Sequence, residues 1–89
     1  MPVKEDTNAT ERNVRDFVIS NFLFGVDDGS LKREDSFLQN GVIDSSGVLE
    51  IVAFLEQSYK IKVNDQELTA RNLDSIQNVA AYVGRKLGR

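Results

Sequence analysis

Hydrophobic residues recur at helical spacing in three parts of this chain. In the first part these residues are Val14, Phe17, Val18 and Phe22, with Phe24 seven positions after Phe17. A repeat of three and four residues places such side chains on one face of a helix. The pattern therefore predicts an amphipathic helix over residues 9–24.

The predicted start of this helix rests on a capping signal. Asn8 can accept a hydrogen bond from the first helical turn, and the carboxylate of Glu11 would complement the helix dipole there. Residues 1–7 are polar, and we expect a flexible N-terminus followed by a single domain at residues 8–89.

A second apolar stripe begins after Ser45. Its members lie on one helical face: Val48, Ile51, Val52, Leu55 and Tyr59, widened by Leu49 and Phe54. Asp44 or Ser45 can cap this helix, which we expect to end near Tyr59 and Lys60, where a β-branched run begins.

The last third of the chain predicts one short and one longer helix. The short helix is expected around Asp65 to Thr69, and Asp74 with Gln77 resembles a capping box before the longer one. Apolar residues then recur at helical spacing up to a glycine at position 88: Ile76, Val79, Ala80, Val83 and Leu87.

Between the first two helices, residues 25–36 are rich in turn formers and charges, which is typical of a loop. Phe37, Leu38, Val42 and Ile43 are apolar enough to fold the rest of this connection onto a core. The expected fold is an all-α four-helix bundle, with three main helices, a short third helix and a long loop between helices one and two.

The composition removes several classes of function. The 89 residues are 40% hydrophobic and 28% charged, as in a folded globular domain, and they include no Cys and no His. Disulfides, thiolate nucleophiles and imidazole bases are therefore excluded. The net charge of −3 argues against nucleic-acid binding. We find no apolar run long enough to span a bilayer and no secretory signal, and expect a cytoplasmic, monomeric protein.

Ser45 is the candidate for chemistry. It is not a typical nucleophile, because Ile43 stands where a nucleophile elbow needs glycine and no histidine can accept the proton. A small hydrolase is accordingly the least favoured hypothesis, and the protein is not expected to be an enzyme. The segment from Asp27 to Ser30 lacks the ligand spacing of a calcium loop.

A serine after Asp44 at a helix start most often acts as a cap. The same position suits a phosphate ester, because the exposed N–H groups and the helix dipole both favour negative charge there. Ser45 is therefore either a cap or the attachment point of a phosphate-linked group.

The wider sequence resembles the acyl carrier proteins, a family of phosphopantetheine-binding proteins. Six segments carry the resemblance: Asp35–Phe37, Gly41–Ser45, Val48–Val52, Phe54–Glu56, Ile61–Val63 with the acidic Asp65–Glu67, and Asp74–Val83. Similarity covers nearly the whole chain after residue 8.

The resemblance implies that a phosphopantetheinyl transferase moves 4′-phosphopantetheine from coenzyme A onto Ser45, with Asp44 recognised by that transferase. The thiol of the arm would then carry acyl or aminoacyl thioesters between a loading ligase and downstream transferases. The reactive sulfur would come from the cofactor, and the chain would be a phosphoprotein of lipid or secondary-metabolite biosynthesis.

Two positions depart from the family pattern. Ser46 replaces an apolar residue that helps partners dock, and Gly47 replaces an acid frequent in carriers of fatty-acid synthesis. Gly47 is either tolerated near the helix start or allows close approach of a partner. Glu50 and Glu56 are the remaining acids of the helix, and the net charge from Asp44 to Lys62 is only −1.

These departures favour a specialised stand-alone carrier of the acyl or aminoacyl type, with Ser46, Gly47, Glu50 and Glu56 as partner-binding residues. A general acyl carrier of fatty-acid synthesis is an alternative. A small bundle that binds partners without being modified is the alternative from another functional class.

Overall fold

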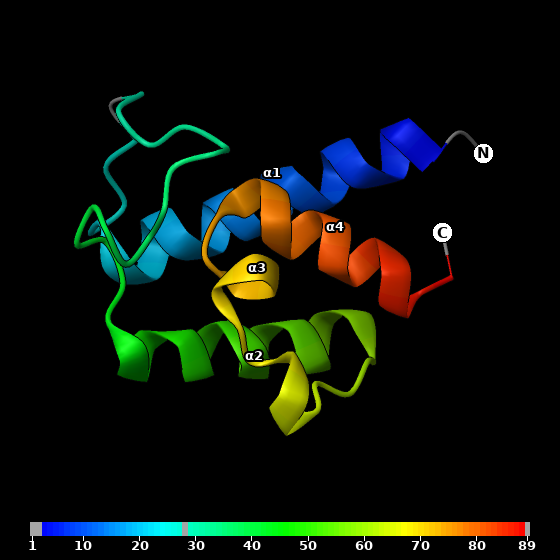
Figure 1. The fold of residues 1–89 in the computed structure, drawn as a ribbon. Helices are drawn as coiled ribbons and strands as arrows, with labels where there is room; N and C mark the ends of the chain where they lie inside the picture. The colour runs from blue at the N-terminus through cyan, green and yellow to red at the C-terminus, as the bar shows by residue number, and fades with distance from the viewer. Residues whose placement is uncertain (1–2, 28, 89) are drawn as a thin grey trace.

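In the computed structural model, residues 3–27 and 29–88 are described, and their regular elements are all helical (Figure 1). The elements are α1 (Val3–Phe22), α2 (Ser45–Tyr59), the 3₁₀ turn η1 (Asp65–Glu67), α3 (Ala70–Leu73) and α4 (Ile76–Lys86). The predicted all-α bundle with a short third helix and a long loop is confirmed.

Two of the three long helices run in the same direction, and the first helix runs opposite to them (Figure 1). α1 runs antiparallel to both α2 and α4, and α3 lies between α2 and α4 (Figure 1). The start of α1 and the end of α4 therefore lie on one side of the molecule, while the long loop and the start of α2 lie on the other.

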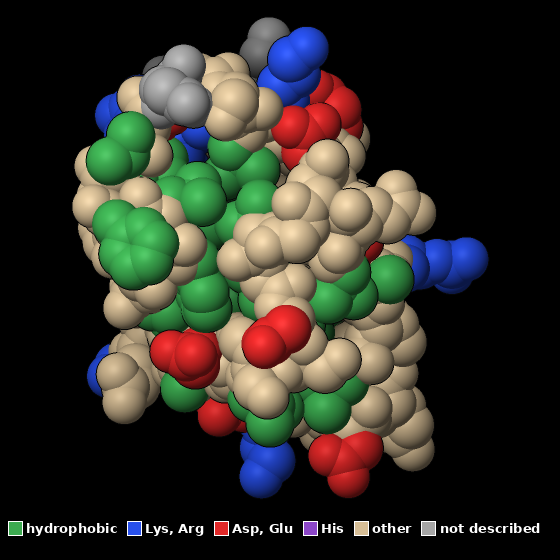
Figure 2. All heavy atoms as spheres, turned by 90° about the vertical axis from the view of Figure 1, so that its left-hand side faces the viewer, with side chains coloured by type: hydrophobic (Ala, Val, Ile, Leu, Met, Phe, Trp, Pro, Cys, Tyr) green, Lys and Arg blue, Asp and Glu red, His purple; other side chains and the backbone are tan. Residues whose placement is uncertain are grey.

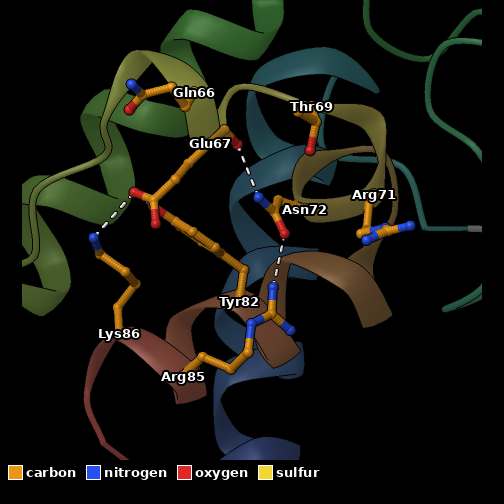
Figure 3. Close-up of a pocket in the computed structure, with 8 residues that line it drawn as sticks. All are labelled: Gln66, Glu67, Thr69, Arg71, Asn72, Tyr82, Arg85 and Lys86. Atoms are coloured by element: carbon orange, nitrogen blue, oxygen red, sulfur yellow. Dashed lines mark hydrogen bonds and ion pairs between the residues drawn. The ribbon is translucent and has the colours of Figure 1, made fainter.

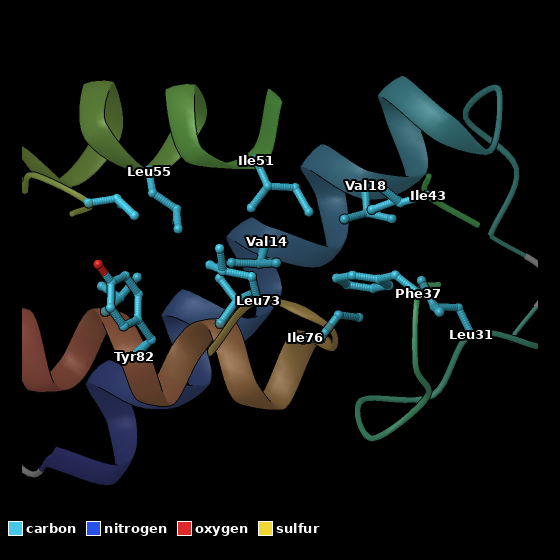
Figure 4. Packing of buried hydrophobic residues seen from close by; sticks show 13 residues of the cluster. Val14, Val18, Leu31, Phe37, Ile43, Ile51, Leu55, Leu73, Ile76 and Tyr82 are labelled. Carbon is cyan, nitrogen blue, oxygen red and sulfur yellow. The ribbon is translucent and has the colours of Figure 1, made fainter. Parts of the chain in front are cut away.

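The core is formed where the apolar faces of these helices meet. Ile51 and Leu55 of α2 point toward Val14 of α1, Leu73 of α3 and Tyr82 of α4 (Figure 4). Burial of such side chains contributes roughly 1.5–3 kcal/mol each, which makes this shared core the main source of stability.

The predicted boundaries of the first helix are wrong at both ends. The helix begins at Val3 and not at residue 9, so that Asn8 lies inside it and is not its cap. No glycine or proline interrupts residues 3–22, and helix formers such as Lys4 and Glu5 allow it to extend. Residues 1 and 2 of the predicted flexible N-terminus lie outside the described residues.

At its other end, α1 stops at Phe22 and does not reach Phe24. Phe24 has a positive φ of 57° and Gly25 one of 80°, so the chain turns away from the helix there. Glu11, predicted to complement the helix start, instead accepts hydrogen bonds from the Arg33 guanidinium, 2.8 Å away at Nε. This interaction lowers the pKa of Glu11 and ties the loop to α1.

The long loop is a packed part of the fold, as predicted, although Leu38, one of the four residues expected to fold it onto the core, is 44% exposed. Leu31, Phe37 and Ile43 are buried in the core, and the backbone N–H of Phe37 donates to the carbonyl of Asp74 at 2.7 Å. Aromatic packing joins α1 and α2, since the rings of Phe17 and Phe54 stack with centroids 4.3 Å apart.

The helical ends in the last third of the chain differ in detail from the prediction. Ser75, and not Asp74, caps α4, where its Oγ accepts from the Asn78 N–H at 3.0 Å. The short helix predicted near Asp65–Thr69 is the 3₁₀ turn η1, and α3 is a further short helix beyond the predicted range. The end of α4 before Gly88 is as predicted.

Candidate functional site

Ser45 is the first residue of α2 and is exposed to solvent. It follows directly on the buried Ile43 and the extended Asp44, which bring the loop to the start of the helix. The first-turn N–H groups of a helix favour negative charge nearby. The hydroxyl of Ser45 is thus accessible at a position suited to a phosphate ester.

Asp44 is the N-cap of α2, in agreement with one of the two predicted caps. Its Oδ1 accepts a hydrogen bond from the Gly47 N–H at 2.8 Å, and its carbonyl accepts from Val48 N–H at 3.2 Å. These bonds hold the first turn in place, with Asp44 as the capping residue. The cap and the candidate attachment point are therefore separate, adjacent residues.

Gly47 is buried by packing within the protein. A β-carbon at this position would lie 2.5 Å from Cγ2 of Ile43 and 2.9 Å from Cε1 of Phe22. These distances are far shorter than ordinary van der Waals contact, so the α1–α2 packing requires glycine here. A contact between Gly47 and a partner stays a prediction.

An apolar cavity of about 300 Å³ lies beside Ser45. Its walls come from the loop, the first turns of α2 and the η1–α3 segment: Leu38, Ser45, Val48, Leu49, Leu68, Thr69, Ala70, Leu73 and Asp74. Leu49 is 60% exposed and lies one helical turn after Ser45. A group attached to Ser45 can therefore contact an apolar surface.

Asp74 fixes the loop that forms one wall of this cavity. Its carboxylate accepts from the Leu38 N–H at 3.0 Å and from the hydroxyl of Ser36, while the hydroxyl oxygen of Ser36 accepts from the Gln39 N–H at 3.1 Å. Sequence reasoning assigned Asp74 to helix capping and missed this role, because its partners lie more than thirty positions away.

The remaining predicted partner-binding residues lie in different environments on α2. Ser46 and Glu50 are exposed, whereas Glu56 is partly buried and accepts a hydrogen bond from the Val63 N–H at 3.0 Å. Glu56 therefore anchors the segment after α2. Partner contacts of Ser46, Glu50 and Glu56 stay predictions.

A second cavity, of about 750 Å³, lies between η1, α3 and the end of α4 (Figure 3). Its lining is polar: Gln66, Glu67, Thr69, Arg71, Asn72, Tyr82, Arg85 and Lys86. Arg85 donates to Asn72 at 2.7 Å, and Lys86 donates to Glu67 at 3.0 Å. These contacts connect the short elements to α4, and Ser45 does not line this cavity.

Glu67 is the centre of that polar network. Its Oε1 accepts from Asn64 N–H, Tyr82 Oη and Lys86 Nζ at 2.9–3.0 Å. Mainly through the Asn64 N–H and then through Lys86 and Tyr82, the pKa of Glu67 is lowered to about 2. Burial, followed by the bond to Glu67, raises the pKa of Tyr82 to about 12.

In the described part of the chain, no three metal-ligating side chains come together. No helix within residues 3–27 and 29–88 is long and apolar enough to cross a membrane.

Comparison with known proteins identifies relatives along most of the chain. An acyl carrier protein of Campylobacter concisus is 35% identical over 81 residues, which cover 91% of this chain and 99% of the relative. An acyl carrier protein of Bdellovibrio bacteriovorus is 30% identical over 78 residues, which cover 88% of this chain and 95% of the relative. The probable acyl carrier protein PigG of a Serratia strain is 28% identical over 75 residues, covering 84% and 85%. No family model matches the chain.

Proposed function

Starting from the chain's membership of the acyl carrier protein family, we propose that it holds acyl or aminoacyl groups as thioesters on a 4′-phosphopantetheine arm attached to Ser45. The family consists of carriers and not of catalysts, so the chain is a carrier protein and not an enzyme. The observation that supports the proposed site best is the exposed Ser45 hydroxyl at the first position of a helix that Asp44 already caps.

The residues around Ser45 fit this arm. Asp44 satisfies the Gly47 N–H, and the positive end of the α2 dipole stabilises a phosphodiester on the neighbouring Ser45. The arm supplies a terminal thiol that forms thioesters. The chain has no cysteine and therefore no thiol of its own. Val48, Leu49 and Leu68 offer an apolar surface beside the attachment point.

We further propose that the carrier serves a specialised pathway. Partners of carriers must find a surface of complementary charge, and such charges set encounter rate and specificity. The exposed acids near the site are Asp44 and Glu50, because Glu56 is engaged by the Val63 N–H. This sparse acidic surface favours a dedicated ligase over the strongly basic partners of general fatty-acid synthesis.

Modification can be tested by co-expression with a broad-specificity phosphopantetheinyl transferase followed by intact mass measurement. We expect the wild type and Ser46→Ala to gain the mass of one phosphopantetheinyl group and Ser45→Ala to gain none. A wild type that stays unmodified would favour the alternative of a non-covalent adaptor. If Ser45→Ala gained the phosphopantetheinyl mass and Ser46→Ala did not, Ser46 and not Ser45 would be the modified residue.

The pathway can be tested with the modified protein. Acyl and amino-acid ligases from neighbouring genes are compared with a malonyl transferase of fatty-acid synthesis, and loading is followed by mass. We expect a dedicated ligase to load the arm faster. Faster loading by the malonyl transferase would support general fatty-acid synthesis instead.

A further inference from the structure

Phe24 is the most exposed large hydrophobic residue at the end of α1. Its side chain is 95% exposed, and its backbone has a φ of 57°. A positive φ is a genuine outlier for a bulky residue, because the β-carbon crowds the backbone. The chain thus holds an aromatic ring in solvent at the expense of backbone strain.

Folding does not account for this ring. The turn after α1 needs a left-handed residue, and it is closed by hydrogen bonds from Gly25 N–H to the Ile19 carbonyl at 2.8 Å and from Val26 N–H to the Leu23 carbonyl at 3.0 Å. Glycine or asparagine would adopt this conformation with less strain. Strain at a residue without a packing role is typical of a functional position.

Phe24 follows the end of α1, which packs against the start of α2, where Ser45 lies. Two residues earlier, the ring of Phe22 packs against Gly47 in the first turn of α2. The end of α1 therefore lies against the start of the helix that presents Ser45. Figure 2 shows hydrophobic side chains exposed on the face where α1 ends and α2 begins. Val26 and Leu49 are 62% and 60% exposed, whereas Ser46 next to the site is polar.

We propose that Phe24 is an aromatic anchor for the phosphopantetheinyl transferase that modifies Ser45, an inference that rests on the proposed function. The ring would enter an apolar pocket of the transferase, and the exposed carboxylates of Asp44 and Glu50 would meet a basic rim.

The chemistry of attachment favours this occupant over other partners. Ligases and downstream transferases act on a thiol at the far end of the arm, but the enzyme that attaches the arm must bring coenzyme A to the Ser45 oxygen itself. In that step the serine Oγ forms a bond to the pantetheine-bearing phosphorus. The phosphoanhydride P–O bond breaks, 3′,5′-adenosine diphosphate leaves with the electron pair, and the hydroxyl proton passes to a base of the transferase. The surface next to Ser45 is therefore in the footprint of this enzyme.

The test measures transfer from coenzyme A by a phosphopantetheinyl transferase on the purified full chain. We compare the wild type, Phe24→Asn, Phe24→Tyr and Leu87→Asn, the last a control with an exposed leucine at the opposite end of the molecule. Loss of an interface anchor typically weakens an association tenfold or more. For Phe24→Asn we expect kcat/KM to fall by about tenfold, mainly through KM. Phe24→Tyr and Leu87→Asn should be modified at the wild-type rate.

The urea midpoint of Phe24→Asn distinguishes a role of the ring in docking from a role in folding. We expect the urea midpoint of Phe24→Asn to equal or exceed that of the wild type, because asparagine tolerates the left-handed conformation. Equal rates for Phe24→Asn and wild type would overturn the anchor while leaving the modification of Ser45 intact. A lower urea midpoint would overturn it as well, since the ring would then support the fold. A wild type that accepts no phosphopantetheine would overturn the proposed function and the anchor together.

Discussion

Replacing Gly47 by alanine tests whether packing or partner contact explains this glycine. The new β-carbon would lie 2.5 Å from Cγ2 of Ile43, whereas ordinary contact begins at 3.4 Å, so the two groups must separate by about 0.9 Å. Ile43 is 2% exposed and β-branched, and its methyl group has little freedom to move. The ring of Phe22 closes the other side at 2.9 Å.

Two opposing terms set the size of the effect. Overpacking a buried site typically costs about 1–3 kcal/mol. Alanine gains at most about 1 kcal/mol over glycine in a helix, and less near the first turn. We therefore expect Gly47→Ala to lower the free energy of unfolding by about 1–2 kcal/mol.

The matched control is Gly84→Ala in the middle of α4. Among the described residues, no atom outside its own helix backbone and chain neighbours lies within 4 Å of a β-carbon there. The helical gain therefore acts alone and should raise stability by up to about 1 kcal/mol. Urea unfolding followed by circular dichroism measures both variants. Each kcal/mol corresponds to about 4–8 °C in Tm for a domain of this size. Equal or higher stability of Gly47→Ala would refute the packing argument.

Three further changes probe the cap, the loop and the polar network. Asp44→Ala removes the acceptor for the Gly47 N–H and should cost about 1 kcal/mol in urea unfolding. Asp74→Ala leaves the Leu38 N–H without this acceptor, and we expect a loss of about 1–3 kcal/mol, with weaker protection of the Leu38 amide in hydrogen exchange. The third concerns acid: since the folded pKa of Glu67 is lowered from 4.5 to about 2, the folded state binds fewer protons than the unfolded state between these values. Stability should therefore fall as the pH is lowered through this range, and Glu67→Gln should reduce that fall in urea titrations at several pH values.

Each of these expectations has a contrary result. An unchanged midpoint for Asp44→Ala would mean that another group caps α2. Normal protection of Leu38 in Asp74→Ala would mean that contacts other than those of the Asp74 carboxylate hold the loop. If the stability of Glu67→Gln fell with decreasing pH as steeply as that of the wild type, other carboxylates would be responsible for the pH dependence.

The features that could be predicted from sequence depend on local patterns. The bounds of α2 follow from a long apolar stripe, a capping aspartate before it and a β-branched run after it, and the structure agrees at both ends. The place of Ser45 at the helix start was predicted from the same local pattern, because it depends on the immediate neighbours of Ser45. Its modification stays a prediction.

The features that were missed depend on residues far apart in the sequence. Ser75 and Asp74 are both good caps, and the choice between them is made by the loop, whose Ser36 and Leu38 bond to Asp74. For Gly47 the sequence left two explanations open, tolerance near the helix start or close approach of a partner, and the contact with Phe22 of α1 lies too far away in the sequence to have been predicted. Glu56 was expected on the partner-binding surface of the helix, but its carboxylate accepts a hydrogen bond from the backbone N–H of Val63, in the segment after α2.

The antiparallel arrangement of α1 and α4 has a practical consequence for handling the protein. The beginning of α1 and the end of α4 lie on the side of the molecule opposite the start of α2 (Figure 1). A fluorophore, affinity tag or surface linker joined at either end would therefore point away from Ser45. An immobilised form of the chain would present the proposed attachment point, Ser45, outward, toward enzymes supplied in solution.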